Sequence, residues 1–179
     1  FDYSINIIPF KLLNGTTTQL YVSNIDYPAI DDVDCDGDLD ILTFNPSGGF
    51  IEYYKNQSVE EGYGLDSLLY ELEDDCWGGI FENSVEQELG LASGPGLCFD
   101  QLLTVQTRHP GSTLLTFDKD NDGDKDMLLG DITYSTISLL NNGGACGQAW
   151  INDQELDFPA DGQTVNIPLF PVSFLADVT

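Results

Sequence analysis

The sequence predicts an all-β fold, because short apolar and β-branched runs alternate with turn signals and because a strand–loop–strand pattern occurs twice. The run at 39–44 is followed by the turn Asn-Pro-Ser-Gly-Gly and by a second run at 50–54. Runs at 127–130 and 136–140 repeat this arrangement. Only residues 65–72, with leucines spaced i, i+3, i+4 and i+7, favour one or two helical turns.

The repeated pattern contains two identical acidic motifs, D-x-D-x-D-G-D-x-D, which we call the first loop (32–40) and the second loop (118–126). They are offset by 86 residues, since 126 − 40 = 86. That offset is about twice the usual length of a propeller blade. The predicted metal-ligating residues are Asp32, Asp34, Asp36, Asp38, Asp40, Asp118, Asp120, Asp122, Asp124 and Asp126.

Alternating aspartates on a tightly curled loop are typical of calcium sites, because calcium takes six to eight oxygen ligands. We expect the side chains at loop positions one, three, five and nine to bind, together with the backbone carbonyl of position seven (Asp38 or Asp124). Glycine at position six permits the sharp turn. An EF-hand would need an acidic residue at position twelve, where this chain has Thr43 and Leu129. The sequence therefore predicts two calcium sites that lead into strands and not into helices.

The composition is strongly acidic, with 31 Asp and Glu against five Lys and Arg and a formal net charge of −26. Such a chain repels nucleic acid and anionic lipid, whose binding depends on basic side chains, so we expect neither as a partner. The most apolar stretch, 5–13, is too short to span a membrane and predicts no membrane insertion. An apolar fraction of 41% is enough for a folded core, so the acidic side chains must be either solvated or neutralised by cations, of which calcium is the obvious candidate.

Four cysteines occur without a C-x-x-C pair, which argues against a zinc site and favours disulfides in an oxidising compartment. Of three possible pairings we favour Cys76–Cys98, inside the segment 59–111. Cys35–Cys146 then follows by elimination, although Cys35 could equally be free. This cysteine usage predicts an extracellular or cell-surface location.

No catalytic motif accompanies these features, and we expect the chain not to be an enzyme. His109 has no identifiable nucleophile partner, and neither G-x-S-x-G, H-E-x-x-H nor a phosphate-binding glycine loop occurs. Trp77, beside two glycines, is expected to be the most exposed aromatic residue, and Tyr53 and Tyr54 to point one inward and one outward.

Residues 29–42 and 116–129 resemble the FG-GAP/VCBS repeats of integrin-α-like β-propellers. The resemblance covers about a third of the chain and implies that each loop joins the first two strands of a blade, with third strands at 50–54 and 136–140. More weakly, the segment 76–79 with Cys98 resembles VCBS-containing surface proteins exported by bacterial type IX secretion.

This resemblance implies that residues 1–179 are one β-propeller fragment, the remainder lying in a longer parent chain. The expected parts are a blade with the first loop (18–58), a disulfide-containing insertion (59–111) with strands near 80–81 and 85–91, a blade with the second loop (112–146), and a linker (147–179). The linker would include the start of a third repeat, with Asp177 as its first ligand.

The implied function is that of a calcium-stabilised repeat module for adhesion, binding a protein or carbohydrate ligand. One alternative is a non-catalytic or loop-supporting part of a polysaccharide-degrading enzyme. Another is a secretion cargo or a subunit of a larger surface assembly.

Overall fold

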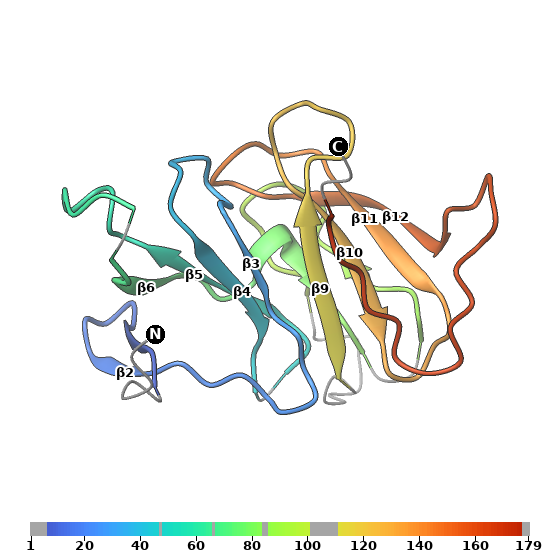
Figure 1. Ribbon diagram of the computed structural model, residues 1–179, viewed down its shortest axis with the longest axis horizontal. Coiled ribbons are helices and arrows are strands. Elements are labelled where there is room, and N and C mark those ends of the chain that lie inside the picture. The colour runs from blue at the N-terminus through green and yellow to red at the C-terminus, as the bar shows by residue number, and fades with distance from the viewer. Residues whose placement is uncertain (1–6, 47, 66, 84–85, 101–110, 177–179) are drawn as a thin grey trace.

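A computed structural model shows the chain as an all-β protein built mainly of two sheets (Figure 1), and describes residues 7–46, 48–65, 67–83, 86–100 and 111–176. The described residues form no α-helix and one short 3-10 turn. The elements are β1 (Pro9–Lys11), β2 (Thr17–Gln19), β3 (Ala29–Asp31), β4 (Asp40–Phe44), β5 (Ile51–Asn56), β6 (Tyr70–Asp74), η1 (Trp77–Gly79), β7 (Ile80–Phe81), β8 (Gly90–Leu91), β9 (Ser112–Phe117), β10 (Asp126–Asp131), β11 (Ile137–Asn142) and β12 (Ile151–Phe158).

The two sheets contain the same four-stranded unit. In unit one, β3, β4, β5 and β6 pair consecutively and antiparallel, and in unit two β9, β10, β11 and β12 do the same. The first sheet is extended at its outer edge by β1, which pairs parallel to β6, and by β2. The predicted all-β class is confirmed, whereas the sheets do not close into a ring.

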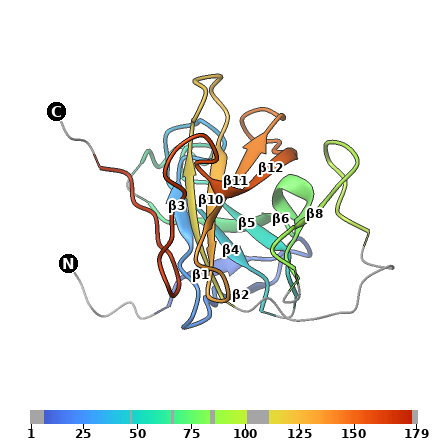
Figure 2. The ribbon, with the colours of Figure 1, turned by 90° about the vertical axis from the view of Figure 1, so that its right-hand side faces the viewer.

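The two units lie side by side through their first strands. Tyr27, just before β3, bridges in parallel to Thr113 of β9, and these residues are themselves 86 positions apart (113 − 27 = 86). The amide of Tyr27 donates to the carbonyl of Ser112 at 2.9 Å, and the amide of Leu114 donates back to Tyr27, also at 2.9 Å. Because equivalent strands run alongside each other, both acidic loops emerge at the same end of the molecule (Figures 1 and 2).

A polar clasp fixes this arrangement near the loops. The hydroxyl of Thr116 donates to Asp31 Oδ2 at 2.8 Å, and the ammonium of Lys125 lies 3.1 Å from the same oxygen. Asp31 thus connects β3 of unit one with two positions of unit two.

The main core lies where the two units and the segment 59–111 meet. Leu42, Ile51, Met127, Leu140 and Ile151 are fully enclosed, each with no exposed surface. Such burial contributes about 1.5–3 kcal/mol for each large apolar side chain, which makes this cluster a major source of stability.

Trp77 belongs to the same core and is only 3% exposed, so the expectation that it would be the most exposed aromatic residue was wrong. The residue lies in η1, which follows β6 and approaches β12 of unit two. Gly78 adopts φ 69° there, and a β-carbon at that position would lie 2.8 Å from Ile151 Cγ1. The backbone at Gly78 packs closely against Ile151, and this packing is possible because glycine has no β-carbon.

Tyr53 and Tyr54 do face opposite sides of the first sheet, yet both are buried. Tyr53 lies in the main core, while Tyr54 joins a second cluster with Phe10 of β1, whose ring centroid is 4.7 Å away. The outward face expected for one tyrosine is covered because side chains of the second cluster, Phe10 among them, pack against it.

The segment 59–111 contributes a strand to the first sheet, a separate two-stranded sheet, and side chains to the core. Its residues 70–74 form β6, and 67–69 are not helical, so the helical turns favoured for 65–72 are absent from its described part. The strand expected near 80–81 is present as β7, and in the described part of the strand expected at 85–91 only residues 90–91 form one, β8. Both predicted disulfides, Cys76–Cys98 and Cys35–Cys146, are formed.

Within the described ranges, no helix is long and apolar enough to cross a membrane. The two disulfides are typical of extracellular proteins and agree with a secreted location. His109 lies outside the described residues, as does Asp177.

Candidate metal centre

The two acidic loops have left-handed backbones at the same two positions. At position four, Cys35 and Asn121 both have left-handed backbones, with φ of 68° and 64°. At position six, Gly37 and Gly123 share φ 97°, which favours glycine strongly. The predicted sharp turn at position six is confirmed, and the sequence repeat is a repeat of structure.

In each loop the position-nine aspartate anchors the loop to the third strand of its unit. Asp40 accepts hydrogen bonds from the amides of Val33 (3.0 Å) and Asn56 (2.8 Å) and from the Tyr53 hydroxyl (3.2 Å). Asp40 has no exposed surface. The carboxylate therefore holds the start of the loop, the strand β4 and the end of β5 together.

Asp126 repeats this role in unit two. It accepts from the amides of Lys119 (3.0 Å) and Asn142 (2.9 Å), which are equivalent to Val33 and Asn56. Among the described residues, neither Asp126 nor Asp40 belongs to the groups of clustered carboxylates described next. The structure gives these two predicted ligands a hydrogen-bonding role.

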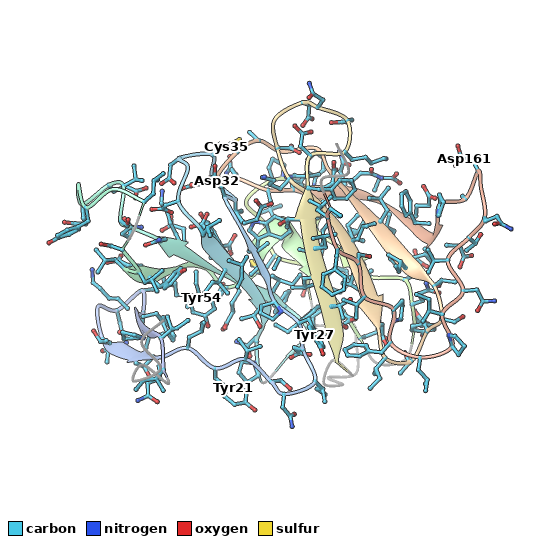
Figure 3. All side chains as sticks on the ribbon, viewed as in Figure 1. Tyr21, Tyr27, Asp32, Cys35, Tyr54 and Asp161 are labelled. Atoms are coloured by element: carbon cyan, nitrogen blue, oxygen red, sulfur yellow. A yellow bond between two sulfur atoms is a disulfide. The ribbon has the colours of Figure 1, made fainter. Side chains whose placement is uncertain are left out.

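The aspartates at positions one, three and five do come together. Each set offers carboxylate oxygens within 4.8 Å of one another, close enough to share one cation. We call them the first trio (Asp32, Asp34 and Asp36) and the second trio (Asp118, Asp120 and Asp122). The first trio is half-buried and the second is exposed (Figure 3 labels Asp32).

Several loop carboxylates contain a buried oxygen without a hydrogen-bond donor. Among the described residues, five buried side-chain oxygens lack any partner, and four of them belong to the loops: Asp32 Oδ1, Asp36 Oδ2, Asp38 Oδ1 and Asp124 Oδ1. Buried polar atoms normally have partners, since leaving one unpaired costs about 1–3 kcal/mol. These unpaired oxygens could accept a cation as their partner.

The same environment raises the pKa of Asp36, Asp40 and Asp124. Burial raises the pKa of Asp40 to about 7, even though hydrogen bonds from Asn56 and Val33 oppose the change. Burial, with neighbouring negative charges, raises the pKa of both Asp36 and Asp124 to about 6. Without a cation these carboxylates are costly to ionise, and a bound cation would favour the charged form.

The first loop also contains charged groups that its motif does not predict. The ammonium of Lys55, in β5, contacts carboxylate oxygens of Asp34 and Glu60. Although burial disfavours its charge, hydrogen bonds to those two carboxylates raise the pKa of Lys55. Glu60 follows β5 in the chain and was missed by the sequence analysis, because nothing in its local pattern places it beside residues 36–38.

The Cys35–Cys146 disulfide joins the first loop to unit two beside the second loop. Its Sγ atoms lie 3.3 Å (Cys35) and 2.9 Å (Cys146) from the carbonyl oxygen of Gly123, at the tip of the second loop. The bridge therefore packs against both loops, and Cys35, at position four, does not take a ligand position.

These residues could hold hard cations through carboxylate oxygens, and the described loop residues offer no sulfur or imidazole ligand. Comparison of the chain with protein-family models, with curated proteins and with solved structures found no match.

Proposed function

We propose that the chain is a calcium-stabilised repeat module of a secreted or cell-surface protein. The observation that carries this proposal is the set of unpaired, buried carboxylate oxygens in two loops that share left-handed backbones at positions four and six. Calcium fits these loops because it accepts many oxygen ligands in flexible geometry, at millimolar concentrations typical of extracellular modules. The ions would be structural, each tying a loop to the strands of its unit.

The module would serve adhesion, that is, the binding of a protein or carbohydrate ligand. Two units clamped by a disulfide and by the Asp31 clasp give a rigid support for surface loops, where binding residues usually lie. A groove of about 350 Å³ in the first sheet presents the exposed side chains of Tyr63 and Leu68 beside the Lys11–Glu71 ion pair. Such apolar surface flanked by charges suits ligand contact.

The resemblance to FG-GAP/VCBS repeats gives the arrangement of the units a rationale. Four-stranded antiparallel units whose first strands lie in parallel, with acidic loops at one end, are what two neighbouring propeller blades would contribute. We therefore propose that units one and two are blades, and that β6 is the fourth strand of the first.

Thermal unfolding with and without calcium tests the structural role of the ions. For the unmodified chain, calcium at about 100 times its dissociation constant should add about 2.7 kcal/mol per site to the free energy of unfolding, relative to EDTA. Asp120→Asn, in the second trio, should reduce the calcium-dependent gain in the free energy of unfolding by the contribution of one site, because an amide oxygen is a weaker ligand than a carboxylate.

Asp161→Asn is the matched control, since Asp161 is exposed and lies far from both loops (Figure 3). This variant should respond to calcium as the unmodified chain does. A melting temperature that is the same in EDTA and in millimolar calcium would contradict the proposal.

A further inference from the structure

A second group of carboxylates adjoins the first trio. Asp36, Asp38 and Glu60 offer oxygens that all lie within 4.8 Å of one another, and we call them the outer group. Two of its members belong to the first loop, whereas Glu60 comes from the turn after β5. The amide of Val59 donates to Asp38 Oδ2 at 3.1 Å and thereby holds this turn against the loop.

The outer group contains buried oxygens for which the protein supplies no donor. Asp38 is only 1% exposed, and its Oδ1 has no hydrogen-bond partner among the described residues. Asp36 Oδ2 is also buried without a hydrogen-bond partner, while Asp36 Oδ1 accepts a hydrogen bond from the amide of Asp38 at 3.0 Å. Position seven was expected to bind through its backbone carbonyl alone, which gives no reason for burying the Asp38 carboxylate.

Lys55 neutralises only part of this charge. Its ammonium contacts Glu60 and Asp34, yet the unpaired oxygens of Asp36 and Asp38 remain without a donor. Close carboxylates repel one another by about 1–4 kcal/mol per pair at surface-like screening, so a further cation would stabilise the ionised form of this group.

We propose that Asp36, Asp38 and Glu60 bind a second divalent cation in the first loop, next to the one assigned to Asp32, Asp34 and Asp36. Asp36 would bridge the two ions, as carboxylates do in paired metal sites. The ion is a hard one such as calcium, because every donor is a carboxylate oxygen. This inference rests on the proposed function, since the two sites share Asp36.

Unit two provides an internal comparison. Asp124 is also buried, 4% exposed, with an unpaired Oδ1, but the described residues supply no third carboxylate to it. The position equivalent to Glu60 is Cys146 (60 + 86 = 146), which is tied up in the disulfide. The second cation is therefore expected in the first loop alone.

The number of bound calcium ions tests this inference. Equilibrium dialysis of the full chain against saturating calcium in 0.15 M salt, followed by metal analysis, should give about three ions per chain: two in the first loop and one in the second. The salt screens loose association of calcium with exposed carboxylates. Glu60→Gln should bind about two ions, because it keeps the side-chain length but weakens the third ligand of the outer group.

Glu61→Gln is the matched control, since Glu61 is the exposed neighbouring residue and lies outside the outer group; it should retain about three ions. If both the unmodified chain and Glu60→Gln bind two ions, the inference of a second cation in the first loop is wrong, but the proposed function stands. Lys55 would then be the counter-ion of the outer group. Three ions in Glu60→Gln would also overturn the inference. No bound ions in the unmodified chain would refute the proposed function as well, and this count is decisive even if a variant fails to fold.

Discussion

Replacing both Cys35 and Cys146 with serine is expected to lower the free energy of unfolding by about 5 kcal/mol. The two cysteines are 111 residues apart, so their bridge removes much of the freedom of the unfolded chain. The loop-entropy relation gives about 4.8 kcal/mol for that separation. Chemical denaturation of the purified, oxidised variant measures the loss.

The Cys76–Cys98 pair is the internal control. Its separation of 22 residues predicts a smaller loss of about 3.4 kcal/mol by the same relation. Because both bridges lie in one protein, the stability of each variant is compared with that of the same unmodified chain. If the Cys76/Cys98 variant were the less stable of the two, the role given to the bridge between the units would be wrong.

Asp40→Ala is expected to cost about 3–5 kcal/mol, as is typical when one partner of a buried charged network is removed. The substitution leaves the amides of Val33 and Asn56 and the hydroxyl of Tyr53 without their acceptor in a fully buried site. The loss should appear in chemical denaturation in EDTA as well as in calcium, because these hydrogen bonds do not need an ion.

Asp161→Ala, at an exposed position, serves as the reference and should change stability by less than about 0.5 kcal/mol. A loss for Asp40→Ala that occurs only in calcium would show that Asp40 acts as a ligand and not as the anchor described above.

The sequence predicted those parts of the molecule that local pattern determines. Alternating aspartates around Gly37 and Gly123 specified the two loops, and β-branched runs specified β4, β5, β10 and β11. These features depend on neighbouring residues in the chain, so spacing and residue type were sufficient. The pairing of the two cysteine pairs also followed, although only by elimination for Cys35–Cys146.

Features that depend on distant pairing were not predictable in this way. The leucines at 65–72 favoured helical turns, yet 70–74 became a strand because β5 and β1 provide hydrogen-bonding edges on either side. Trp77 and Tyr54 were misjudged for the same reason, since the segments that cover them come from elsewhere in the chain. Glu60 has no local signal and reaches the first loop only through the turn after β5.

The central claim, that the acidic loops hold calcium, is tested most directly by a crystal structure grown in several millimolar calcium with anomalous diffraction data. We expect an anomalous peak in each loop, with carboxylate oxygens of the first and second trios at about 2.3–2.6 Å from it. Loops that remain without an anomalous peak under those conditions would contradict the claim.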